Sequence, residues 1–164
     1  MKKILLALLM VMPLSVFAQK FGHFNLNEVG AAMPEAATLQ QELETKSKAV
    51  QAEVERMQAE FKVKLEDYQK NVDTLTEGIK ERREQELTEL QQRIEEYVNK
   101  SRQDLSEYNN QKTQEIMEKL LKAVEAVGQE GGYVYILDVA SIPYVSKTLS
   151  TDVTQQIKAK LGLK

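Results

Sequence analysis

Residues 50–75 read VQAEVERMQAEFKVKLEDYQKNVDTL, and residues 87–120 read LTELQQRIEEYVNKSRQDLSEYNNQKTQEIMEKL. In both stretches an apolar side chain recurs mostly every three or four positions, which is the spacing of a coiled-coil seam. Most residues between them are Glu, Lys, Gln and Arg, which favour helices. Between residues 35 and 127 the chain has no Pro and a single Gly, Gly78. The sequence therefore predicts two long helices, each with one apolar stripe.

The two apolar stripes match as mirror images about a point near residues 79–80. Leu39 then lies opposite Leu120, and Tyr68 lies opposite Leu90, as two antiparallel helices require. This shared pattern favours a helix that folds back on itself over one continuous rod. The expected seam of the hairpin consists of Leu43, Val54, Phe61, Leu65, Val72, Leu87, Ile94, Val98, Leu105 and Ile116.

We expect this antiparallel α-helical coiled-coil hairpin to form an arm over residues 34–127, with its tip near residues 78–83. Gly78 lies at the predicted turn, where a left-handed backbone conformation costs a glycine little. Residues 35–127 contain 21 acidic and 15 basic residues, a net charge of −6. The charges interleave as on a solvated helix face, except at the tip. There, the basic residues Lys80, Arg82 and Arg83 form either a charged turn or a contact point for anionic headgroups or an acidic partner.

The first eighteen residues have the pattern of a secretory signal peptide. Lys2 and Lys3 precede a continuous apolar run, and Ala18 closes a small-residue cleavage pattern. The run is too short to span a bilayer. We therefore expect cleavage after Ala18 and a periplasmic location for the mature protein. The mature chain has 20 basic and 25 acidic residues, a net charge of −5.

The chain on either side of the hairpin reads as short strands. Residues 21–26 and 133–137 are rich in aromatic and apolar residues, and residues 144–146 are a third candidate strand. A short helix is expected to begin at Thr151-Asp152 and to end at Gly162. Residues 19–33 and 128–164 together then form a β-rich body. Its expected oligomerisation residues are Phe24, Leu26, Tyr133, Val134 and Ile136.

A three-stranded sheet has two open edges and little core, so this body is too small to be stable alone. The simplest solution is a homo-oligomer in which several subunits close the sheet edges together, and a homotrimer suits the strand number. The expected fold class is thus α+β and mostly α. Each subunit contributes one long hairpin arm, and a small β-barrel body forms by oligomerisation.

Composition excludes most chemical functions. The chain of 164 residues has no Cys and one His, so it has no disulfide, thiolate nucleophile or Cys-ligated metal. His23 lies between Gly22 and Phe24 with no nucleophile or acid at motif spacing, and Asp138 has no patterned second carboxylate. Nucleotide-binding glycine motifs are missing as well. We therefore expect no enzyme activity, cofactor or metal, and the net acidity argues against nucleic acid as a partner.

Several short motifs in a fixed order resemble the Skp/OmpH family of periplasmic chaperones over essentially the whole mature chain. These motifs are Gly22-His23-Phe24-Asn25, Pro34, Glu130-Gly131-Gly132-Tyr133 leading to Leu137-Asp138, and Asp152-Val153-Thr154 with Leu161-Gly162. The resemblance implies a homotrimer whose three arms enclose a cavity. It also implies an ATP-independent holdase that binds unfolded outer-membrane proteins and prevents their aggregation.

The charge of this chain departs from the family pattern, because well-known members are strongly basic. With acidic arms, capture of clients must depend on apolar contact and enclosure, or on basic clients. The family's lipopolysaccharide-binding residues are not assigned in this chain, because it has no matching basic cluster other than the one at the tip. Peripheral membrane contact is expected only at the tip. The alternative hypothesis is a non-enzymatic coiled-coil spacer or adaptor of the cell envelope.

Overall fold

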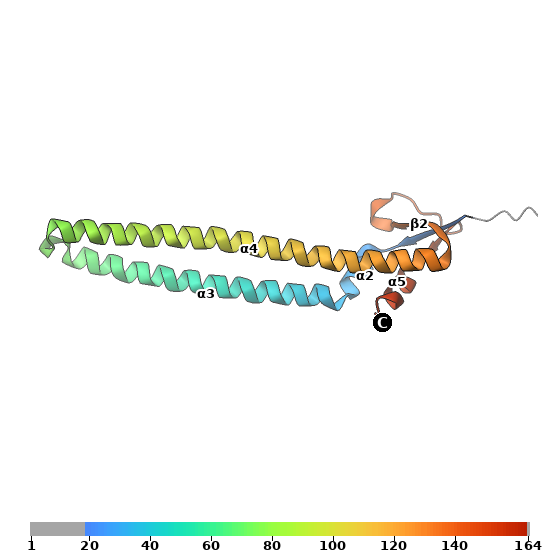
Figure 1. Cartoon of the computed structure of the whole chain (residues 1–164), viewed down its shortest axis with the longest axis horizontal. Helices are drawn as coiled ribbons and strands as arrows, with labels where there is room; N and C mark the ends of the chain where they lie inside the picture. The colour runs from blue at the N-terminus through green and yellow to red at the C-terminus, as the bar shows by residue number, and fades with distance from the viewer. Residues whose placement is uncertain (1–18, 164) are drawn as a thin grey trace, which may run out of the picture. The chain divides into compact units, whose positions relative to one another are not determined.

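The computed structural model describes residues 19–163, so the expected signal peptide over residues 1–18 lies outside the described residues. The elements in chain order are strand β1 (Lys20–Phe24), helices α2 (Leu26–Ala32) and α3 (Pro34–Asn71), the 3-10 turn η2 (Val72–Thr74), helix α4 (Glu77–Gly131), strand β2 (Tyr133–Asp138), the 3-10 turn η3 (Val139–Ser141), strand β3 (Ser150–Asp152) and helix α5 (Thr154–Lys160) (Figure 1). The prediction of a mostly helical α+β chain with one long hairpin is confirmed.

The chain divides into two compact units. The arm unit comprises residues 30–122 and contains α3 and most of α4. The body unit comprises residues 19–29 together with residues 123–163, and it contains the three strands, the end of α4 and α5. Among the helices in residues 19–163, none combines the length and apolarity that crossing a bilayer requires.

In the arm unit, α3 and α4 run antiparallel and side by side (Figure 1). Pro34 occupies the first turn of α3, where its missing N–H costs no hydrogen bond, and Met33 before it is extended. The buried apolar side chains of this unit are Met33, Leu39, Met57, Leu90 and Leu120. All ten residues of the expected seam are half-buried. The arm therefore has a narrow core with wet outer faces, as a two-helix seam requires.

The turn of the hairpin lies earlier than the sequence pattern predicted. Helix α3 ends at Asn71, η2 follows, and α4 begins at Glu77, so the chain reverses before residues 79–80. Gly78 is inside the first turn of α4, and within residues 19–163 only Gly132 and Gly162 have a positive φ. The physical reason is the group of short polar residues Asn71, Asp73, Thr74 and Thr76, whose side chains compete with helical hydrogen bonds. One of them, the Thr74 hydroxyl, donates to the Asn71 carbonyl at 2.8 Å.

The register of the hairpin also differs from the mirrored pattern. That pattern pairs Tyr68 with Leu90, whereas in the structure the Tyr68 hydroxyl donates to Glu84, six positions earlier in α4. Near the base of the arm, Lys119 donates to Glu35. The physical reason is that a heptad-like stripe matches its partner again after every one or two turns, so the stripe alone does not fix the register.

The body unit contains a parallel sheet of order β2-β1-β3. The apolar residues buried in this unit come from β1, α2, the end of α4 and the α5 region; they are Phe24, Val29, Ala123, Val127, Val153 and Ile157. Gly132, with φ of 64°, ends α4 and turns the chain into β2. The Asp138 carboxylate at the end of β2 accepts from the Leu26 backbone N–H at 3.1 Å, which joins β2 to the start of α2.

Three expectations for the body are wrong. Residues 144–146 form no strand; the third strand is β3, which pairs with β1 through Ser150, Thr151 and Asp152. Leu26 does not continue β1, because Asn25 accepts the Glu28 N–H through its side-chain oxygen and begins α2. The closing helix begins at Thr154, two residues later than predicted.

Candidate functional site

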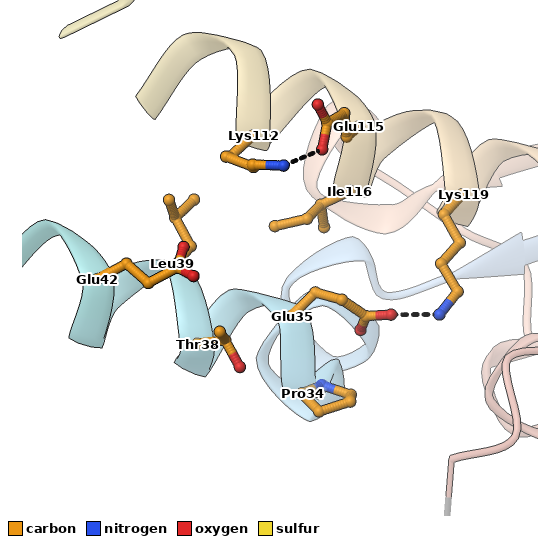
Figure 2. A pocket seen from close by; sticks show the side chains of 9 residues that line it. All are labelled: Pro34, Glu35, Thr38, Leu39, Glu42, Lys112, Glu115, Ile116 and Lys119. Carbon is orange, nitrogen blue, oxygen red and sulfur yellow. Dashed lines mark hydrogen bonds and ion pairs between the residues drawn. The ribbon is translucent and has the colours of Figure 1, made fainter. Parts of the chain in front are cut away.

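The arm unit has an open cleft between α3 and α4, of about 460 Å³ (Figure 2). Leu39 from α3 and Ile116 from α4 face each other across it and provide its apolar part. Its rim is charged and mixed in sign; the charged residues are Glu35, Glu42, Lys112, Glu115 and Lys119. The cleft therefore presents an apolar floor between polar walls.

Ion pairs and hydrogen bonds occupy most of the charged groups of this cleft. Lys119 donates to Glu35 across the two helices, and this hydrogen bond lowers the pKa of the Glu35 carboxyl. Lys112 donates to Glu115 at 2.6 Å within α4, which likewise lowers the pKa of the Glu115 carboxyl. The second carboxylate oxygen of Glu35, Oε2, is buried without a hydrogen-bond partner. Of these two pairs, Lys119–Glu35 joins the two helices, whereas Lys112–Glu115 lies within α4.

A second feature of the arm unit is a set of large apolar side chains that remain exposed. They are Val63, Ile79, Met117 and Leu121. Val63 is 66% exposed and Leu121 is 53% exposed, and these two lie on different helices. They are scattered single side chains, which can make weak apolar contacts but do not form one binding pocket. The sequence pattern missed them because they fall outside the predicted seam.

The basic residues of the expected tip lie beside acidic residues. Lys80 lies 3.9 Å from Glu77, and Arg82 and Arg83 lie 3.3 and 3.5 Å from Glu86. All three basic residues are in the first turns of α4 and not in the reversal itself. The tip thus includes a charged helix start in which two arginines share one glutamate, and contact with an anionic partner stays a prediction.

In the body unit, one face of the sheet is apolar and exposed. Phe21 and Tyr135 stack with ring centroids 6.3 Å apart and planes at 11°. Tyr144 and Leu149, which follow β2 in the chain, are 80% and 77% exposed. A cavity of about 290 Å³ opens among these four residues. A face of this kind normally marks a surface that another molecule covers.

The residues predicted for oligomerisation lie in β1, at the start of α2 and in β2, and their role in oligomerisation stays a prediction. Phe24 is buried, and Ile136 is half-buried and contacts the position of Gly22, on the side of the sheet opposite Phe21. Leu26 and Tyr133 are half-buried, and Val134 is exposed. A period of two separates Phe21 from Gly22 and Phe24 along β1, but it fails in β2, where the neighbours Val134 and Tyr135 are both exposed.

His23 lies on the same face as Phe21 and is close to one hydroxyl. Its Nδ1 is 2.7 Å from Ser150 Oγ. The carboxylate of Asp152 accepts instead from the Thr154 backbone N–H and hydroxyl, which lower the pKa of Asp152. Over the described residues, no group of His, Asp or Glu side chains gathers in a way that could hold a metal ion.

Comparison with known proteins gives consistent results. The model of the family described as outer membrane protein (OmpH-like) matches residues 20–161. Chaperone protein Skp of Yersinia enterocolitica is 24% identical over 146 residues, covering 88% of this chain and 89% of the relative. A solved structure of an OmpH-like protein from Caulobacter crescentus has the same fold, with a TM-score of 0.76 at 12% identity over 87% of this chain and 83% of that chain. The chain therefore belongs to the OmpH-like family, the same Skp/OmpH family that its sequence motifs resemble.

Proposed function

We propose that this protein is an ATP-independent periplasmic holdase chaperone, which binds unfolded outer-membrane proteins between its arms and prevents their aggregation. Membership of the OmpH-like family over nearly the whole described chain carries this proposal. The location rests on the predicted signal peptide, and the client class rests on the family resemblance.

The exposed apolar side chains of the arm suit such a role. Burying a fully exposed Leu or Met is worth about 1.5–3 kcal/mol, and Val63 and Leu121 are already partly covered. One arm therefore supplies only a few kcal/mol after the cost of ordering the client. Several arms acting on the same chain would add their contributions through effective concentration. The total affinity for the client would then be high although each contact is weak, and weak contacts leave the client unfolded.

The body supports a homotrimer as the working unit. Within the described residues, β2 and β3 each pair only with β1, so each has one free edge. The exposed face around Phe21, Tyr135 and Leu149 adds apolar area that water contacts in a single copy. Further copies of the chain can cover both features at once. A closed β-body with three arms around a cavity follows from this assembly.

The experiment is to dilute an unfolded outer-membrane β-barrel protein from urea into buffer containing an excess of this protein and to follow turbidity. The holdase suppresses the turbidity without ATP. The test variant replaces the exposed apolar residues: Val63→Thr, Ile79→Gln, Met117→Gln and Leu121→Gln. The matched control replaces exposed polar residues of α4: Asn99→Gln, Ser106→Gln, Asn109→Gln and Thr113→Gln. We expect the test variant to lose protection and the control to keep it. Unchanged aggregation with the parent protein would sink the proposal.

The alternative, a coiled-coil spacer or adaptor of the envelope, is favoured by one observation. Ion pairs between residues three or four apart follow both helices of the arm and stiffen them, as in Lys48–Glu44 and Lys100–Asp104, each at 2.6 Å. A spacer would retain one folded partner in a stoichiometric pulldown and leave aggregation of unfolded chains unchanged. The two assays together separate the candidates.

A further inference from the structure

The apolar stripes of the arm are compatible with more than one register. In the mirrored register, Leu39 lies opposite Leu120 and the turn falls near residues 79–80, beside Gly78. The structure has instead a turn before Glu77 and contacts between the helices that lie five to nine positions earlier in α4. The offset of six positions at Tyr68 corresponds to a slide of about 9 Å between the helices.

Apolar packing alone does not decide between the two registers, because a heptad-like stripe meets its partner again after one or two turns. The side chain of Ser101, a polar residue, is among the buried side chains of α4, with 8% exposure. The cleft between Leu39 and Ile116 leaves part of the apolar floor uncovered. The mirrored register would place Leu39 opposite Leu120 and Val54 opposite Leu105, so it also brings apolar residues together. Contacts outside the seam can therefore decide between the two registers.

Three polar contacts join the helices, and we name them the register contacts. They are Tyr68 hydroxyl to Glu84, Tyr108 hydroxyl to Glu42, and Lys119 to Glu35. Lys46 reinforces the second of them, since its Nζ lies 4.5 Å from the centre of the Tyr108 ring.

The register contacts depend on the slide between α3 and α4, whereas the other ion pairs described in the arm do not. Those pairs join residues three or four apart within one helix, such as Arg56–Glu53, and survive any slide. A displacement of about 9 Å would break all three register contacts, because a hydrogen bond does not extend beyond about 3.5 Å. These contacts thus distinguish one register from the other.

We propose that the register contacts lock the arm in the observed register, and that the arm adopts the mirrored register when they are removed. The arm is then a two-state element whose helices slide past each other and move the turn toward Gly78.

Cysteine pairs report each register separately, because the natural chain has no Cys. Thr38 and Glu115 line the same cleft, so the pair Thr38→Cys with Glu115→Cys reports the observed register. The pair Thr38→Cys with Leu121→Cys reports the mirrored register. The cross-linker is a bifunctional maleimide with a span shorter than the slide. Mixing light and isotope-labelled protein identifies cross-links between copies by mass spectrometry, and only links within one chain are scored.

Each pair is placed in the parent and in a variant without the register contacts, Tyr68→Phe, Tyr108→Phe and Lys119→Gln. The matched control, Tyr97→Phe with Lys100→Gln, changes the same residue types but removes only an ion pair within α4. In the parent and the control we expect the first pair to react and the second to react weakly. In the variant we expect the ratio of the second link to the first to rise about tenfold or more, since each hydrogen bond contributes severalfold to the equilibrium.

An unchanged ratio in a variant that retains its helical circular dichroism would overturn the proposal, as would an equal rise in the control. If the combined variant loses its helical signal, the three single variants carry the test. A ratio equal to the parent's in all three singles would then overturn it, and a rise in each would support it.

Discussion

Gly78 distinguishes the observed turn from the one that the sequence pattern predicted. It lies in the first turn of α4 with no positive φ, and a Cβ at this position meets no atom within 4 Å. Replacing Gly78 by Ala should therefore stabilise the protein by about 0.4–1 kcal/mol, because the unfolded chain loses conformational freedom. The comparison variant is Gly132→Ala, at φ of 64°, which should destabilise by about 1 kcal/mol. Urea unfolding measures both. A loss of stability in Gly78→Ala would place the turn at Gly78 after all.

The ion pair between Glu35 and Lys119 predicts a pH dependence of stability. Lys119 lowers the pKa of the Glu35 carboxyl in the folded protein, so the folded state binds a proton less readily than the unfolded chain. The stabilisation is therefore complete above the ordinary pKa of a glutamate, about 4.3, and is lost as the pH falls through the lowered folded value. The pair is partly exposed, so its contribution is about 1 kcal/mol or less.

The measurement for this ion pair is urea unfolding of the parent and Glu35→Gln between pH 7 and pH 2.5. We expect the parent to be more stable at pH 7 and the difference to vanish at the acid end. Glu55→Gln, at an exposed position of the same helix, is the control. A difference that stays constant over the whole pH range would mean that the charge of Glu35 has no part in the stabilisation.

At the scale of the elements, the helices were predictable and their alignment was not. Long apolar periodicity and the absence of Pro predict α3 and α4 well, because both signals repeat over many turns. The repeat itself hides the register, since a slide by one or two turns restores the pattern. Single contacts such as Tyr68 to Glu84 decide the alignment, and the periodic pattern of the sequence does not predict them.

The sequence predicts the short helices and strands of the body less well than the long helices of the arm. Helix α2 has seven residues and β3 has three, too few for a period to emerge. Side-chain caps determine them instead, as Asn25 does for α2 and Asp152 does for α5. The exposed aromatic face could not be predicted without the pairing of β1 with β2. The register of the two strands decides which of their side chains lie on the same face of the sheet.

The hairpin predicts an asymmetric response to deletion. Removing residues 58–64 from α3 alone leaves α4 with seven unmatched residues, so we expect the melting temperature to fall by about 5 °C or more. Removing residues 58–64 and 88–94 together shortens both helices by the same length and keeps the contacts near the base. This double deletion should melt close to the parent. Thermal circular dichroism measures both variants, and equal melting temperatures for the single and double deletions would contradict the paired arm.

At the scale of the whole molecule, charge predicts how clients are captured. The mature chain carries a net charge of −5, and acidic residues outnumber basic ones in the arm, where about half of the charged residues form ion pairs. Attraction over long distances to acidic clients is therefore weak, and apolar contact remains as the main contribution. We expect the affinity for an acidic unfolded outer-membrane protein to stay constant or to increase between 50 and 500 mM NaCl. Fluorescence titration at fixed pH measures it. A tenfold loss of affinity at high salt would show that electrostatic attraction drives capture.

A homotrimer would explain two features of the surface. It would cover the exposed face of the sheet, and it would leave the scattered apolar side chains of the arm free to contact a client. Light scattering on a size-exclusion column, with and without an unfolded outer-membrane β-barrel protein, tests both parts in one measurement. We predict the mass of three copies for the protein alone and the mass of three copies plus one client for the complex. A monomer that elutes without bound client would contradict the account.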